Sequence, residues 1–169
     1  NHAPSYRMGD DELPPLEASL TKKSTLQEHL MWQLQLSTLD EADITIATRL
    51  IGNVNDDGYI NATVLDDIAL DHGLPTADVE WILEQIQSFD PIGVAARDLS
   101  ESLLLQAEHY FPANETLHGV IENHLSNLEK RNYPPILHDL GINTEDLKAV
   151  LKLISSLEPK PGREFAPDD

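Results

Sequence analysis

Oxygen-bearing side chains gather in one segment of this 169-residue chain, at residues 53–61. They are spaced as in a calcium-binding loop, with oxygen ligands at positions 1, 3, 5 and 9, glycine at position 6 and an aliphatic residue at position 8. Position 1 is Asn53 rather than aspartate, and position 12 is Val64, which cannot supply the bidentate carboxylate of such loops. An ordinary Asp-Gly turn between two helices accounts for the same residues. If the segment did bind calcium, the chain would be a calcium-responsive helical adaptor using residues 53–64. We keep this function as an alternative.

The residue patterns of other catalytic and metal-binding chemistries are missing from the sequence. There is no cysteine, which excludes disulfides, thiolate metal sites and cysteine nucleophiles. The seven histidines form no His-Glu-x-x-His pattern, and His118 and His124 are six residues apart, on different faces of a helix. The sequence also lacks a Gly-x-Ser-x-Gly elbow and a glycine-rich phosphate loop. We expect neither enzymatic activity nor a cofactor or metal.

Charge is the strongest signal in the composition. The formal net charge is −19, and residues 24–112 alone carry −14, with sixteen acidic side chains against Arg49 and Arg97. Binding to a phosphate backbone needs lysine and arginine, so this imbalance argues against nucleic acid as a direct partner. A negative field instead favours basic protein surfaces. A merely well-solvated surface explains the same composition, and both readings stay open.

The apolar runs and the ends of the chain indicate where in the cell the protein is located and whether the chain is a fragment. No apolar run approaches the length needed to span a bilayer, and the first residues lack the layout of a signal peptide. We expect a cytoplasmic protein with no membrane partner. The chain starts at Asn1 and ends at Asp169 without natural-looking termini, so we expect a piece of a longer protein. Residues 1–23 are predicted to be a flexible linker, with one short anchored stretch around residues 13–20.

From Ser24 onward the apolar spacing is helical and no segment alternates with period two, which predicts an all-α fold. Capping boxes are expected at Ser24 with Gln27 and at Thr38 with Glu41. Thr63 and Thr76 are expected to cap the next two helices, and Gly73 to end the first of them in a left-handed conformation. Further helices are expected over residues 94–110, 115–130, 134–140 and 144–156.

A repeat with an offset of 68 residues divides the chain. The stretch GLPTADV at 73–79 reappears as GINTEDL at 141–147, and the apolar and stop positions that follow it match without a gap. Each copy reads as a short helix, a glycine turn and a capped helix, the layout of a helix-turn-helix unit. We therefore expect two small helical lobes, residues 24–112 and 113–169, each with one such unit. Coincidence among capped helices is the alternative.

The second helix of the first copy lacks the chemistry of a DNA reader. It presents Asp78, Glu80 and Glu84 where arginine, lysine, asparagine or glutamine would be needed. Trp81 falls nearly opposite the apolar stripe of this helix, so it is either an interface anchor or packs on a neighbouring helix. Arg97 could pair with Asp90 or Glu101 to hold a turn, or contact a partner.

Three separated stretches resemble motifs of one family. They are IGNVNDDGYI at 51–60, FDPIGVAARDL at 89–99 followed by LLLQ at 103–106, and ISSLEPKPG at 154–162. In this order they resemble the enhancer-dependent bacterial sigma factor of the nitrogen-regulation type, sigma fifty-four, over residues 24–165.

The resemblance implies a core-binding domain, all-helical and in two lobes, that docks onto core RNA polymerase for transcription initiation. Such factors hold the polymerase in a closed complex until an ATP-dependent activator remodels it. Promoter DNA and that activator would be bound only through regions absent from this chain. Residues 1–23 would belong to the family's acidic linker. The candidate residues for polymerase contact are Glu80, Trp81, Glu84, Gln87 and Ser88, the turn residues Phe89, Asp90, Pro91 and Gly93, and Arg97.

Overall fold

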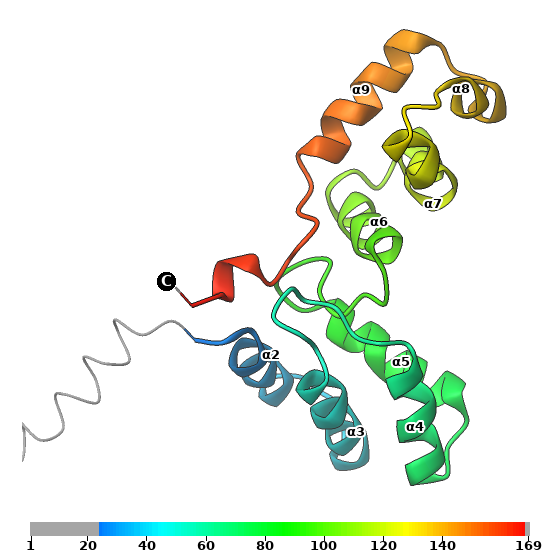
Figure 1. Ribbon diagram of the computed structural model, residues 1–169. Coiled ribbons are helices and arrows are strands. Elements are labelled where there is room, and N and C mark those ends of the chain that lie inside the picture. Colours follow the sequence, from blue (N-terminus) through cyan, green and yellow to red (C-terminus); the bar gives the residue numbers. More distant parts are fainter. Residues whose placement is uncertain (1–23, 168–169) are drawn as a thin grey trace, which may run out of the picture.

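The computed structural model describes residues 24–167, and within this range the protein is all-α, as predicted. The only strand-like pairing among these residues is an isolated bridge between Tyr59 and Ala96. The eight helices within residues 24–167 are α2 (Leu26–Gln35), α3 (Glu41–Gly52), α4 (Thr63–His72), α5 (Thr76–Gln87), α6 (Leu99–Tyr110), α7 (Glu115–Glu129), α8 (Pro134–Leu140) and α9 (Thr144–Ser155); a 3-10 turn, η1, follows at Arg163–Phe165 (Figure 1). The predicted linker at 1–23 lies outside the described residues. None of the described helices is long and apolar enough to cross a membrane.

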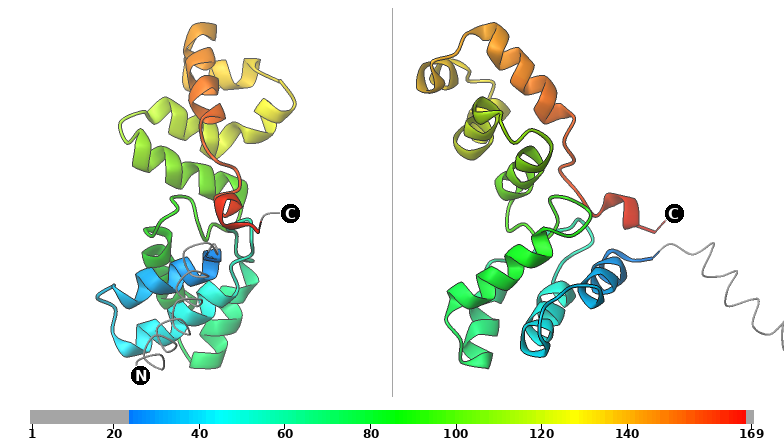
Figure 2. Two further views of the ribbon diagram at one scale, coloured as in Figure 1. Left: turned by 90° about the vertical axis from the view of Figure 1, so that its left-hand side faces the viewer. Right: turned by 180° about the vertical axis from the view of Figure 1, so that it is seen from behind.

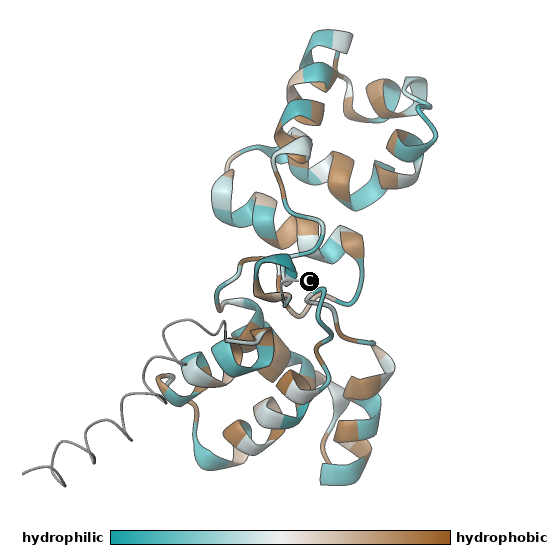
Figure 3. Cartoon of the chain, turned by 60° about the vertical axis from the view of Figure 1, so that its left-hand side comes forward, coloured by the Kyte–Doolittle hydropathy of each residue, from teal (hydrophilic) through white to brown (hydrophobic). Residues whose placement is uncertain are grey.

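Helices α2 to α5 pack around one cluster of buried aliphatic side chains. Leucine, isoleucine and valine fill it, with Leu30, Leu50, Ile68 and Leu83 fully buried. Helix α3 lies against α2, α4 and α5, because its buried stripe includes both Leu50 and Ile51. In Figure 3 the hydrophobic residues of these helices lie mainly on the sides that face one another.

Helices α6 to α9 pack around a second cluster, centred on α7. Leu117, Val120 and Ile121 of α7 are fully buried, and α6, α8 and α9 each contact this helix. Leu103 and Ala107 of α6 belong to this second cluster. Along the chain, the buried residues of the first cluster end at Ala95 and those of the second begin at Leu103.

The chain after α9 returns to the first cluster. In both views of Figure 2 it leaves the C-terminal end of α9 and runs back toward α2. There, the ring of Phe165 packs against the first cluster and stacks on His29, with 4.9 Å between ring centroids. Elements at the two ends of the described chain are thereby joined.

Several predicted helix starts were wrong by one or two residues. Thr25, not Ser24, caps α2 in a capping box with Glu28, and Asp40, not Thr38, caps α3. Thr63 and Thr76 are the first helical residues rather than caps; Pro75 precedes the latter, and its fixed φ suits the entry into α5. Neither Ala62 before α4 nor Pro75 before α5 makes a side-chain capping bond.

The predicted helix over residues 94–110 was wrong at its start, because α6 begins only at Leu99. Residues 94–96 are buried in an irregular turn instead, and Ala95 adopts a left-handed φ of 63°. The side chain of Asp98 then accepts a hydrogen bond from the Glu101 N–H and caps α6. Local spacing suggested a longer helix, whereas packing of this turn between the clusters interrupts it.

The two copies of the repeat end their first helices alike. Gly73 after α4 has φ 64° and ψ 36°, and Gly141 after α8 has φ 61° and ψ 39°. This confirms the predicted left-handed C-cap at Gly73. The copies differ in packing: α4 lies directly against α5, whereas α8 and α9 both lie against α7.

Candidate partner-binding surface

The face of α5 that the sequence singled out is exposed at its centre. Trp81 is 48% exposed, and Glu84 and Ser88 are exposed on the following turns. Glu80 is half-buried, because its carboxylate contacts Arg97 at 3.2 Å. The Trp81 ring therefore lies on the outside, as its position opposite the apolar stripe predicts, and not in the core.

Gln87 does not belong to this exposed face, which corrects the expectation. Its side chain is buried, and its amide nitrogen donates to the carbonyl of Ala95 at 2.9 Å and to Glu101 at 3.3 Å. The helical projection of α5 did not show that the irregular turn before α6 lies over this side chain. Gln87 therefore fixes the turn and has no free surface for a partner.

Arg97 is held by two carboxylates. Its Nε and Nη2 donate to Glu101 at 3.0 and 2.6 Å, and its Nη1 donates to Glu80 at 3.2 Å. Burial opposes ionisation of Glu101, but hydrogen bonds from the Arg97 side chain and backbone outweigh it and lower the pKa of Glu101. Of the two pairings that the sequence allowed, Glu101 is the one formed. Arg97 thereby ties α5 to the start of α6.

The turn at residues 89–93 is mostly an interior element. Phe89 packs against the first cluster, and Pro91 and Gly93 are buried, so Asp90 is the exposed member. Gln33 holds the backbone of Asp90: it accepts from the Asp90 N–H at 2.8 Å and donates to the Asp90 carbonyl at 2.7 Å. The role of Gln33 was not predicted from the sequence. Its only indication there is that a polar residue lies near the apolar stripe of α2.

A groove of about 260 Å³ opens between α5 and α6. Half-buried Leu104 and Leu105 supply its apolar part, and the Arg97–Glu101 pair lies along it. Two exposed carboxylates, Glu84 from α5 and Glu108 from α6, also line the groove. The exposed face of α5 therefore continues into an acidic groove.

The segment that resembles a calcium loop is held by hydrogen bonds of its own. The Asn55 carboxamide oxygen accepts from the backbone N–H groups of Asp57 and Tyr59, both at 3.0 Å. Val64, at the position of the missing carboxylate, packs against the first cluster. Within residues 24–167, no group of three metal-ligating side chains is close enough to hold an ion. This geometry favours the ordinary turn over the calcium loop.

The three sequence motifs meet at this turn. The Gly58 carbonyl accepts from the Ala95 N–H at 2.7 Å, and the Asp57 carbonyl accepts from the Gly162 N–H at 3.0 Å. The Tyr59 hydroxyl donates to the Pro159 carbonyl at 2.6 Å. Motifs far apart in the sequence thus build one junction between the two hydrophobic clusters.

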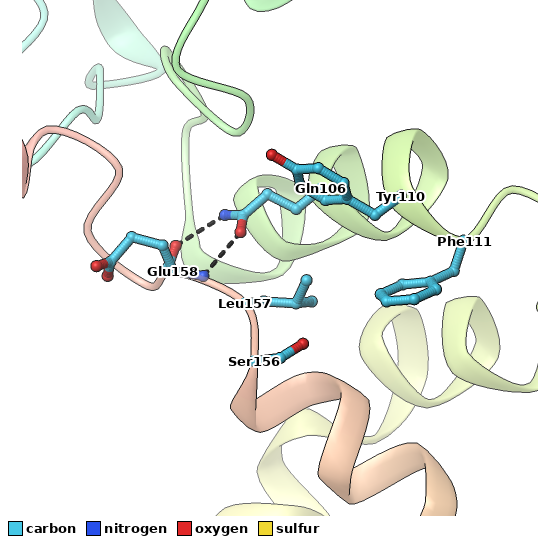
Figure 4. A pocket seen from close by; sticks show the side chains of 6 residues that line it. All are labelled: Gln106, Tyr110, Phe111, Ser156, Leu157 and Glu158. Carbon is cyan, nitrogen blue, oxygen red and sulfur yellow. Dashed lines mark hydrogen bonds between the residues drawn. The ribbon is translucent and has the colours of Figure 1, made fainter.

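A pocket of about 390 Å³ lies beside this junction, between the end of α6 and the segment after α9 (Figure 4). Tyr110 and Phe111 border it on one side, and Leu157 on the other. The Gln106 side chain crosses between the two sides and bonds the backbone of Glu158. Its polar atoms are thereby engaged within the chain.

Comparison with known proteins accounts for the spacing of these motifs. The family model for the Sigma-54 factor, core binding domain, matches residues 15–169. The chain belongs to this sigma-54 family. This match confirms the resemblance seen in the three motifs. Sigma-54 factors are transcription factors and not enzymes, in agreement with the expectation of no enzymatic activity.

Curated relatives of the chain are named RNA polymerase sigma-54 factor. An RNA polymerase sigma-54 factor of Azotobacter vinelandii is 38% identical over 154 residues, covering 86% of this chain and 31% of that protein. Those of Salmonella typhimurium and Escherichia coli are 37% and 35% identical, covering 96% and 92% of this chain and 35% and 33% of theirs. The chain thus spans about a third of the length of these sigma-54 relatives.

Proposed function

We propose that this chain docks onto core RNA polymerase and serves transcription initiation at activator-dependent promoters. The observation that carries the proposal is the match of residues 15–169 to a family described as a core-binding domain. The charge of the chain supports it, since residues 24–112 carry −14 and favour a basic protein over a phosphate backbone. Contacts with promoter DNA and with the ATP-dependent activator would belong to parts of the relatives that this chain does not span. Its place of action would be the cytoplasm.

Two lobes would present the docking surface. The two separate clusters of buried side chains, one formed mainly by α2–α5 and one by α6–α9, support a division into two lobes. Each lobe would contain a helix-turn-helix-like unit, α4–α5 and α8–α9, and their matching glycine C-caps support this. Residues 1–23 would act as a linker.

The face of α5 is the proposed contact. Exposed Trp81 has the size and position of an interface anchor, and Glu84 and Ser88 extend its surface. Asp90 is the accessible residue of the neighbouring turn. Gln87, Pro91 and Gly93 are buried, so they would support this surface from within.

Competition for core RNA polymerase tests the proposal. The chain should comigrate with core polymerase on a native gel and displace an intact sigma-54 factor at micromolar concentration and moderate salt. Random duplex DNA at low salt should not bind it, because the charge opposes contact with phosphates. Failure to compete under these conditions would refute polymerase docking, whereas tight DNA binding would refute the charge argument.

The calcium-responsive adaptor is the less supported alternative. It would require residues 53–64 to surround an ion, but Asn55 is engaged by backbone N–H groups and Val64 is packed inward. The geometry of the turn therefore favours polymerase docking.

A further inference from the structure

The groove between α5 and α6 has an unusual combination of features for a surface hollow. Its apolar part is Leu104 and Leu105, which are half-buried and therefore only partly covered by the chain itself. Trp81 lies one turn before Glu84 on α5, so its exposed ring is a neighbour of Glu84 on the helix surface, although it does not line the groove itself. A hollow with a partly apolar lining and an exposed aromatic ring nearby is suited to receiving a partner side chain.

The charged residues of the groove indicate which charge the partner's side chain must carry. Arg97 is its single cation, and its Nε, Nη1 and Nη2 all donate to Glu101 or Glu80. It therefore has little capacity left for an anionic ligand. Glu84 and Glu108 are exposed, and their carboxylates form no ion pair or hydrogen bond within the described part of the chain. Both negative charges are thus available to a ligand.

We propose that this groove receives a lysine or arginine side chain from a basic segment of core RNA polymerase. Its aliphatic stem would lie on Leu104 and Leu105, since long basic side chains bury their methylene groups while their charged ends stay near solvent. Its charged end would be shared by Glu84 and Glu108, and a guanidinium could also stack on Trp81. The inference rests on the proposed function and adds the chemistry of the polymerase segment that is bound.

Cross-linking from the groove tests the location of the contact. The chain has no cysteine, so Glu84→Cys and Glu108→Cys each provide a single attachment point for a photoreactive thiol reagent. With core RNA polymerase, both should cross-link to a peptide that contains lysine or arginine. Glu122→Cys, at an exposed position on α7, is the matched control and should give little product. Equal cross-linking from position 122, or attachment to an acidic peptide, would overturn the proposal.

Charge removal tests the energetics. The double variant Glu84→Gln/Glu108→Gln should bind core polymerase about tenfold more weakly, with a shallower dependence on salt, as expected for losing two charge contacts. Glu122→Gln/Glu129→Gln removes the same charge from exposed sites on α7 and should bind like the unchanged chain. If both doubles bind like the unchanged chain, the groove proposal fails alone. If the unchanged chain binds no polymerase, the proposed function fails with it.

Discussion

Gln106 holds Glu158, 52 residues away, through both polar groups of its backbone. The Glu158 N–H donates to Gln106 Oε1 at 2.8 Å, and Gln106 Nε2 donates to the Glu158 carbonyl at 2.7 Å (Figure 4). Gln33 holds the backbone of Asp90 in the same way. Two buried or half-buried glutamines thus attach irregular segments to helices, which gives those segments a fixed path without secondary structure.

Replacing Gln106 should loosen the segment after α9. Gln106→Ala removes both hydrogen bonds to Glu158, and we expect a loss of roughly 2–3 kcal/mol in unfolding free energy, as for unmade buried hydrogen bonds. Urea denaturation would measure it, and hydrogen exchange at the Gly162 N–H should become faster. Gln85→Ala is the control, because the Gln85 side chain donates only to the Trp81 carbonyl at 3.4 Å. Equal losses in the two variants would contradict a special role for Gln106.

At the junction, the backbone of Gly162 lies close against the backbone of Asp56. The methyl group of an alanine at position 162 would overlap the Asp56 carbonyl oxygen, so alanine requires the two backbones to separate. We expect Gly162→Ala to cost about 1–3 kcal/mol, the usual range for overpacking, measured as a lower midpoint in urea.

Gly52→Ala is the matched control for Gly162→Ala. Gly52 is the last residue of α3, and no atom from another part of the chain lies within 4 Å of the position that an alanine methyl group would take there. Because alanine favours helix over glycine, Gly52→Ala should leave stability unchanged or raise it by up to about 1 kcal/mol. A harmless Gly162→Ala would mean that the segment after α9 is not closely held.

The ion pair of Arg97 and Glu101 predicts a pH dependence of stability. The pKa of Glu101 is lowered in the folded protein, so its ionised form contributes stability above the ordinary glutamate pKa of about 4.3. That contribution is lost as the pH falls through the lower folded-state pKa. The unfolding free energies of the unchanged chain and Glu101→Gln should therefore differ most near pH 7 and converge as the pH falls below the ordinary glutamate pKa of about 4.3. A difference that stays constant over this range would exclude the ion pair as its cause.

The sequence predicted the helices and the family well, and the junction poorly. Apolar spacing identifies helices such as α7 and α9 because each buries one continuous stripe. The turn at residues 94–98 was wrongly predicted as helix. Its backbone is held by hydrogen bonds with Gly58 and Ile60, which are far away in the sequence, so local apolar spacing could not reveal it. The sequence did not predict the burial of Gln87 for the same reason, because the turn that covers it was not predicted.

Calcium should leave the chain unchanged. Because Asn55 bonds backbone N–H groups and Val64 occupies the twelfth position of the loop, no bidentate carboxylate can close around an ion. Titration calorimetry at millimolar calcium should show no binding heat, and the melting temperature should not move. Binding heat that disappears in Asp57→Asn would revive the adaptor function.

Trp81 and Leu83 should separate binding from folding, because they lie two residues apart on α5 with opposite exposures, 48% and 0%. Trp81→Ala should weaken binding to core polymerase while changing the unfolding free energy by less than about 1 kcal/mol, since much of the ring is already in water. Leu83→Ala should instead cost about 2–5 kcal/mol by leaving a cavity in the first cluster. Urea denaturation and native-gel competition measure the two effects on the same samples. If Trp81→Ala destabilised the chain as strongly as Leu83→Ala, the ring would be structural, and the α5 face would lose its anchor.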